Sequence, residues 1–248
     1  MDLVRKSEAL LREAARRPIR EIRRLALDLK RLWRLWVKSD TARYNKIFIA
    51  GCARSGTTLT QRLMGCFEDT FVHQAEARYV HLDMMDRPEA NLVVKRSERS
   101  HAHLARLPRA IGLIYCVRHP FDVLTSSHPE SRGQRRFHVT PERWLAEYDA
   151  LLRLRKAQPS RAIVYARYED MIARPDAVQE RIAQAFDLKS RIRFSDDPSN
   201  PIRATSLKKW ERNEEFRTYL HTLPPIFLAR LKGFCDEFGY DMPDWARG

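Results

Sequence analysis

Five short apolar runs, separated by segments with helical periodicity, constrain the fold of this 248-residue chain most strongly. Strands spaced this far apart need crossover connections, which place them parallel in one sheet with helices on both faces. Several runs are continuously apolar, as expected for strands covered on both sides. The runs are KIFIAG (46–51), TFVHQA (70–75), NLVVKR (91–96), GLIYCVR (112–118) and RAIVYAR (161–167). The sequence therefore predicts an α/β fold with a central parallel sheet of about five strands and a ligand site at their carboxyl ends.

Helix signals occupy the gaps between the predicted strands. A Thr-Pro-Glu start predicts a helix over 140–154, and a Pro-Asp start predicts another over 175–186. Helical patterns are also expected over 60–67 and over 225–238, the latter closed by a glycine. The stretch 189–205 has no periodicity and is expected to be a loop.

The positive charge of the chain is concentrated at its N-terminus. The formal net charge is +14, and residues 1–38 hold twelve Lys/Arg against five Asp/Glu, which is half of the excess. Apolar residues recur there at three- and four-residue steps. We expect residues 1–44 to form a basic amphipathic helical extension and residues 45–248 to form the main domain. The extension is expected to pack on the domain, to form a homo-oligomer, or to contact an anionic membrane surface peripherally.

The sequence shows no membrane-spanning or secretory pattern. Its apolar runs are too short to cross a bilayer, and charged residues interrupt the N-terminus. We therefore expect a cytoplasmic protein, with peripheral membrane contact as the alternative. The four cysteines lack the spacing of a disulfide framework or zinc site, so no metal is expected.

A glycine-bearing turn joins the first predicted strand to a helix and indicates phosphate binding. It reads GCARSGTTL, from Gly51 to Leu59. The glycines let backbone N–H groups point inward, and the helix N-terminus adds partial positive charge. Thr57 stands where the triphosphatase loop G-x-x-x-x-G-K-[ST] has its lysine. Because cleavage of the β–γ bond of ATP needs that lysine, the loop favours a donor with one phosphate that carries a different leaving group.

This turn resembles the 5′-phosphosulfate-binding loop of the sulfotransferase family, commonly P-[KR]-[ST]-G-T-T, with Ala53 replacing the proline. It is closer to the carbohydrate and tyrosylprotein type than to the cytosolic type. The resemblance implies 3′-phosphoadenosine 5′-phosphosulfate (PAPS) as donor, with Arg54 at the bridging oxygen. The residues implied to hold the 5′-phosphate are Ser55, Gly56, Thr57 and Thr58.

Further stretches, in the order of the family, extend the resemblance to about residues 47–210. IYCVRHPFDVLTSSH (114–128) is similar to the 3′-phosphate site, which implies that Arg118 and Ser126 bind that phosphate. In VYARYEDM, Tyr168 corresponds to the tyrosine near the adenine. SLKKW resembles a closing element over the donor, with Lys209 or its neighbour Lys208 as the basic contact.

The resemblance also implies catalytic residues. Arg54 and the strand-end Lys95 are expected to offset charge on the bridging oxygen. In HQAEAR, Glu76 is the expected general base and Arg78 its partner. Two histidines downstream of the lysine, His101 and His103, are the alternative bases.

We expect sulfuryl transfer from PAPS to an acceptor hydroxyl, with carbohydrate or another alcohol favoured and tyrosine or lipid as alternatives. The acceptor is expected to be acidic if the arginine-rich segment 127–139 lines the site. Nucleic acid is not an expected partner of this enzyme. Two other functions stay open, a P-loop kinase-like nucleotide enzyme and a nucleic-acid or membrane-binding module built on residues 1–38.

Overall fold

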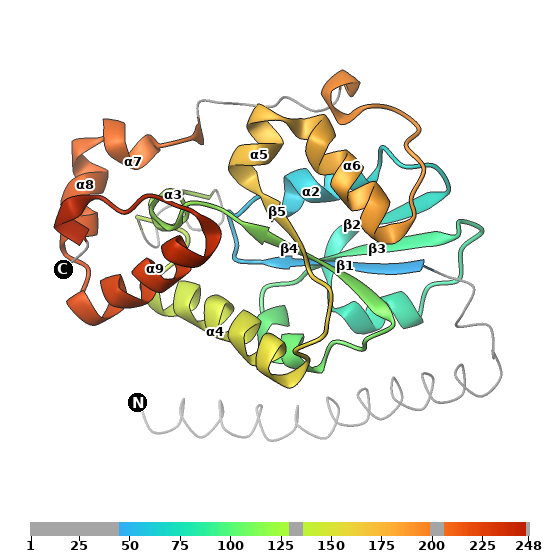
Figure 1. Cartoon of the computed structure of the whole chain (residues 1–248), viewed down its shortest axis with the longest axis horizontal. Coiled ribbons are helices and arrows are strands. Elements are labelled where there is room, and N and C mark those ends of the chain that lie inside the picture. The colour runs from blue at the N-terminus through green and yellow to red at the C-terminus, as the bar shows by residue number, and fades with distance from the viewer. Residues whose placement is uncertain (1–44, 129–135, 199–205, 247–248) are drawn as a thin grey trace, which may run out of the picture. The chain divides into compact units, whose positions relative to one another are not determined.

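A five-stranded parallel sheet forms the centre of the described chain, which comprises residues 45–128, 136–198 and 206–246 of this computed structural model (Figure 1). The strand order is β2-β3-β1-β4-β5, and all four neighbouring pairs are parallel. The strands are β1 (Asn45–Gly51), β2 (Thr70–Ala77), β3 (Asn91–Arg96), β4 (Ile111–Val117) and β5 (Val164–Arg167). The predicted α/β class and five-stranded parallel sheet are therefore confirmed. The predicted helical extension at residues 1–44 lies outside the described residues.

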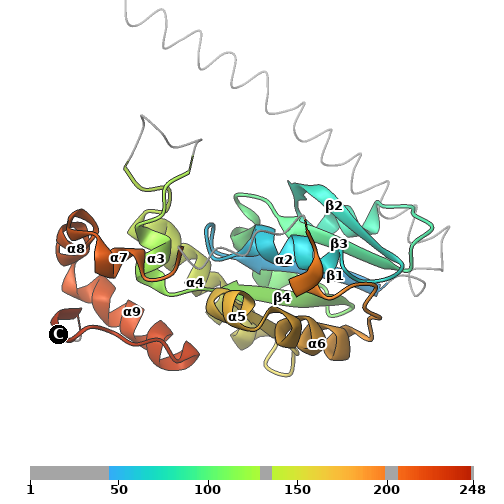
Figure 2. The same ribbon diagram turned by 90° about the horizontal axis from the view of Figure 1, so that it is seen from above.

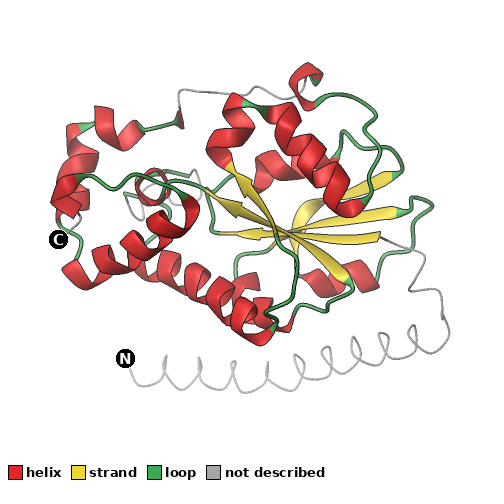
Figure 3. Cartoon of the chain, viewed as in Figure 1, coloured by secondary structure: helices red, strands yellow, loops and turns green. Residues whose placement is uncertain are grey.

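Helices cover both faces of the sheet, as Figure 3 shows. One face carries α2 (Thr57–Met64), α5 (Tyr168–Ala173) and α6 (Pro175–Phe186). The other carries α4 (Pro141–Ala157) and the short 3-10 helices η2 (Tyr79–Asp83) and η3 (Ser100–Arg106). Each face has its own apolar cluster because side chains alternate along a strand.

The central strand β1 shows why its middle residues are all apolar. Ile47 and Ile49 are fully buried in the cluster with α2, while Phe48 is fully buried in the cluster with α4. Burying a side chain of this size contributes about 1.5–3 kcal/mol. Substituting a polar residue at any of these positions would therefore remove a large share of the free energy of unfolding of a single domain.

A group of helices lies on the side of the sheet where the strands end (Figure 2). It includes α3 (Pro120–Leu124), α7 (Lys209–Arg212), α8 (Glu214–His221) and α9 (Pro225–Phe238). Two further 3-10 turns are η5 (Phe194–Asp196) and η7 (Asp244–Ala246). No helix of the described ranges is long and apolar enough to span a membrane.

Several predicted element boundaries differ from the structure by two or three residues; β2 ends at Ala77 rather than at residue 75, and α4 ends at Ala157 rather than at residue 154. The helix predicted to begin at residue 60 begins at Thr57, because Gly56 adopts φ 100° and caps it directly. The last predicted strand begins at Val164 rather than at residue 161, and the Arg161 guanidinium instead donates to the carbonyls of Leu107 and Pro108.

Candidate active site

The loop between β1 and α2 is a tight turn that needs its glycines. Gly51 and Gly56 have φ of 130° and 100°. A Cβ atom at Gly51 would lie 2.5 Å from the Cys116 carbonyl oxygen, and one at Gly56 would lie 2.8 Å from a ring carbon of Tyr168. Both positions therefore exclude larger residues by conformation and by space.

The N-terminus of α2 is open to an anion. Its cap residue Gly56 supplies no side-chain hydrogen bond, and the first turn contains no acidic residue. The first N–H groups of a helix have no partner within the helix, so they can donate to a phosphate. Ser55 has a different role, because its N–H and its hydroxyl both donate to the Cys52 carbonyl, at 3.2 and 2.7 Å. Ser55 thus stabilises the loop from inside.

Arg118 directly adjoins this loop, although 64 residues separate it from Arg54. Arg118 follows β4, is 5 % exposed, and donates to the carbonyl of Arg54 at 3.1 Å. It also donates to the carbonyl of Ser206 at 2.5 Å, and its guanidinium carbon lies 4.3 Å from the centre of the Tyr168 ring. Its Nε has no hydrogen-bond partner in the described chain. The loop and the strand-end arginine therefore form one site.

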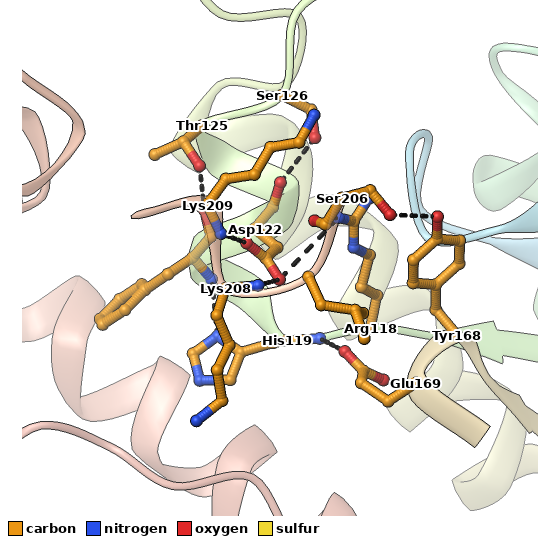
Figure 4. Close-up of polar contacts among 12 residues, drawn as sticks. Arg118, His119, Asp122, Thr125, Ser126, Tyr168, Glu169, Ser206, Lys208 and Lys209 are labelled. Carbon is orange, nitrogen blue, oxygen red and sulfur yellow. Dashed lines mark hydrogen bonds and ion pairs between the residues drawn. The ribbon is translucent and has the colours of Figure 1, made fainter. Parts of the chain in front are cut away.

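Asp122 organises the cations around Arg118, as Figure 4 shows. It is 3 % exposed, and its carboxylate accepts the N–H groups of Lys208 and Lys209 at 2.9 and 3.0 Å. The same carboxylate lies 3.8 Å from the Arg118 guanidinium. The hydroxyl of Ser126 donates to the backbone carbonyl of Asp122 at 2.5 Å. The sequence prediction missed Asp122, which lies in the first turn of α3, four residues after Arg118.

Tyr168 and Glu169 connect β5 to the same site. The Tyr168 hydroxyl lies 2.5 Å from the Ser206 hydroxyl, and its ring packs over Gly56 and Arg118. Glu169 accepts the N–H of His119 at 2.9 Å and the hydroxyl of Tyr240 at 2.9 Å. The predicted adenine-side tyrosine therefore touches both predicted phosphate-binding elements.

Lys95 and Glu76 face each other from neighbouring strands. The two residues are paired in register between β3 and β2, and the Lys95 Nζ lies 3.4 Å from a Glu76 carboxylate oxygen. Lys95 is 7 % exposed and also donates to the Thr58 hydroxyl at 3.1 Å, at the start of α2. Glu76 lies within β2 rather than after it, and its ion pair is with Lys95 rather than with the expected Arg78.

An irregularity in β2 brings Glu76 to this position. Val72 pairs with Val93 and Glu76 with Lys95, so β2 uses two more residues than β3 over the same length. Gln61, on α2 and 7 % exposed, donates from its amide to the carbonyls of His73 and Gln74 at 2.6 and 3.1 Å. Gln61 thus stabilises the bulge, and the register shift at this bulge places Glu76 opposite Lys95. The sequence prediction missed this residue because a glutamine in a helix carries no signal of its own.

His101 lies on the other face of the sheet. Lys95 and Arg96 are consecutive strand residues and therefore point in opposite directions. Arg96 makes a buried ion pair with Glu147 of α4 at 2.9 Å, and the His101 ring nitrogen lies 3.4 Å from the same carboxylate oxygen. His101 therefore belongs to the Arg96 side, away from Lys95. His103, the other alternative base, lies on the same short helix η3.

A groove of about 770 Å³ begins at Thr58 and Lys95 and runs beside α2. We call it the α2 groove, and its lining comes from α2, β2, β3 and the segment 191–197. The other described lining residues are Gln61, Arg62, Gly65, Cys66, Val72, Gln74, Arg191, Ile192 and Asp197. The groove thus gives a second molecule access to the Lys95 side of the loop.

Comparison with known proteins identifies the family of this chain. The model of the "Sulfotransferase domain" family matches residues 44–223, which is more than half of the chain. Among solved structures, the sulfotransferase domain from the curacin biosynthetic pathway aligns with a TM-score of 0.54 at 15 % identity, over 81 % of this chain and 99 % of that one. A sulfotransferase from Alicyclobacillus acidocaldarius aligns with a TM-score of 0.49 at 14 % identity, over 82 % and 98 % of the two chains. No curated protein matches the chain significantly. On the family match, this chain belongs to the sulfotransferase family and is a sulfotransferase.

Proposed function

We propose that this sulfotransferase takes its sulfuryl group from PAPS and transfers it to a hydroxyl of a carbohydrate or another alcohol. The observation that carries the proposal is the contact between Arg118 and the lysine-free loop. A helix N-terminus for one phosphate and a buried guanidinium for another suit a nucleotide with phosphates at both ends of one adenosine.

The donor would lie across the ends of β1 and β4. In this proposal the N–H groups at Gly56, Thr57 and Thr58 hold the 5′-phosphate, and Arg118 with Ser126 holds the 3′-phosphate. Arg118 fits this role because a guanidinium has five N–H donors and only two make hydrogen bonds within the described residues. Lys209 would contact the donor from the segment that Asp122 holds.

Arg54 and Lys95 would offset charge on the bridging oxygen as the bond to sulfur breaks. Arg54 adopts φ 69° at the tip of the loop, and partial burial together with the charge of Arg118 lowers its pKa. A guanidinium remains charged despite such a change. Lys95 is held by Thr58 and Glu76, so its charge is in place before the reaction.

Glu76 is the proposed general base. Its side chain is 51 % exposed and can therefore meet an incoming hydroxyl, while its ion pair with Lys95 keeps it beside the loop. It would remove the acceptor proton as the acceptor oxygen attacks sulfur. Arg78 is exposed just after β2, two residues beyond Glu76. In this proposal Arg78 contacts the acceptor and does not pair with Glu76.

A thermal-shift comparison tests the choice of donor. We expect 3′,5′-bisphosphoadenosine to stabilise the protein and ATP with magnesium to leave it nearly unchanged, since bound ligand at a hundred times its Kd adds about 2.7 kcal/mol. Stabilisation by ATP with magnesium alone would instead indicate a kinase-like nucleotide enzyme. A sulfur-labelled PAPS assay over a panel of acceptors then identifies the class of hydroxyl.

A further inference from the structure

We propose that the α2 groove binds an elongated, hydroxyl-rich acceptor with an anionic group, such as an acidic oligosaccharide. This inference rests on the proposed function and adds the class of acceptor and the residues that would select it. The anionic group would be a carboxylate or a sulfate, bound by Arg62 and Arg191.

The groove starts at the proposed reaction centre and follows one face of a helix. Thr58, Arg62 and Gly65 are spaced by four and three residues, so they lie along the same side of α2. Thr58 also accepts the hydrogen bond of Lys95. The volume of about 770 Å³ is in the range of pockets for small molecules. An acceptor with its hydroxyl at Lys95 would therefore extend along α2.

The lining of the groove favours a polar acceptor. The described part of its lining contains no aromatic side chain, and Val72 and Ile192 are the only large apolar residues in that part. A pocket for a phenol or a lipid is instead lined mainly by apolar and aromatic side chains. Hydroxyl groups of a sugar suit this surface better, because they can donate and accept hydrogen bonds along it.

The charge of the groove favours an anionic acceptor. Among the described residues, three cations line it, Arg62, Lys95 and Arg191, against the carboxylate of Asp197 and that of Glu76, which pairs with Lys95. Arg191 is held in place by a hydrogen bond to the Gly65 carbonyl at 2.9 Å. Arg62 is exposed, and its side chain makes no hydrogen bond or ion pair with the described residues. Two guanidinium groups thus lie along the groove. A guanidinium group can bind a carboxylate or a sulfate with two parallel hydrogen bonds.

The position of the anion follows from helix geometry. Arg62 is four residues and Gly65 seven residues beyond Thr58, which corresponds to about 6 and 10 Å along the axis. The acceptor should therefore carry its anionic group about one to two helical turns from the hydroxyl that receives the sulfuryl group.

Matched acceptors test this proposal. Uronic-acid disaccharides and their carboxyl-reduced forms differ only in the charged group, as do sulfated disaccharides and their desulfated forms. With sulfur-labelled PAPS, we expect the charged member of at least one pair to have a kcat/KM about tenfold higher. The double variant R62A/R191A should bring that ratio close to one, and R62K/R191K should restore part of it. R153A, an exposed arginine of α4 on the other face of the sheet, is the control and should keep the ratio.

Each other outcome has a defined meaning. Equal or faster transfer to the neutral members, or a ratio that R62A/R191A leaves intact, would overturn the anionic subsite. Transfer to no member of the panel, with binding of 3′,5′-bisphosphoadenosine preserved, would overturn this acceptor class and leave the proposed donor standing. Failure of the wild-type protein to bind 3′,5′-bisphosphoadenosine would instead refute the proposed function.

Discussion

The substitution Gln61→Met tests whether the bulge in β2 positions the proposed base. Methionine keeps the length and most of the volume of the buried glutamine but cannot donate to the carbonyls of His73 and Gln74. Two hydrogen bonds at about 0.5–1.5 kcal/mol each give a loss of about 1–3 kcal/mol, and this loss acts first on the segment that the bonds hold. Glu76 should then spend less time opposite Lys95.

The expected result is a fall in kcat with nearly unchanged donor affinity. If the whole loss of about 1–3 kcal/mol destabilises the bulge, the arrangement with Glu76 opposite Lys95 becomes about 5- to 150-fold less populated. This factor is the largest decrease in kcat that we expect. The Kd of 3′,5′-bisphosphoadenosine, measured by calorimetry, should change by less than about twofold, because among the described residues no hydrogen bond joins the loop or Arg118 directly to residues 73–77. Amide exchange over residues 73–77 should become faster.

A matched control separates positioning from general loss of stability. Gln158, on the other side of the sheet, also donates to two backbone carbonyls, those of Ala105 and Leu107, and its side-chain oxygen accepts from Arg161. Gln158→Met removes three hydrogen bonds, so it should lower the free energy of unfolding by at least a similar amount and leave kcat unchanged. Equal effects of the two substitutions on kcat, or a fully active Gln61→Met enzyme, would refute the positioning role.

Three further predictions concern single residues of the site. Glu76→Gln should lower kcat by about 100-fold or more with donor affinity preserved, and a fully active variant would remove Glu76 as the base. Gly56→Ala should weaken 3′,5′-bisphosphoadenosine binding by at least about tenfold, since φ 100° and the Tyr168 ring 2.8 Å away leave no room for a methyl group; titration measures this, and unchanged affinity would contradict it. Asp122→Asn should release the backbone at residues 208–209, seen as faster proteolytic cleavage there; unchanged cleavage would show that the segment is held otherwise.

The strand pattern was predictable because it is local. Short continuous apolar runs such as the one around Ile47 are typical of strands covered on both sides, and a parallel sheet follows from their spacing. The glycine turn was predictable for the same reason, since two glycines five residues apart between a strand and a helix have few other uses. That Arg118 adjoins this turn required the resemblance to the sulfotransferase family and is visible in the structure.

The contacts that position the site were not predictable from the pattern. The partners of Asp122 lie 86 and 87 residues away, and nothing in the local sequence connects them. The bulge that places Glu76 is a register shift between two strands, which apolar periodicity does not record. Glu76 was therefore expected after the strand and paired with Arg78, whereas the structure has it within β2 and paired with Lys95.

One titration tests most directly whether the loop and Arg118 bind opposite ends of a single donor. Binding of 3′,5′-bisphosphoadenosine and of adenosine 5′-phosphate is measured by calorimetry for the wild type and for Arg118→Ala. The four affinities form a thermodynamic cycle that gives the coupling between Arg118 and the 3′-phosphate. We predict that the wild type binds adenosine 5′-phosphate about 10- to 100-fold more weakly than 3′,5′-bisphosphoadenosine. For Arg118→Ala, the two affinities should differ by less than about threefold. If loss of the 3′-phosphate has the same effect in both proteins, Arg118 does not bind that phosphate and the proposed donor site is wrong.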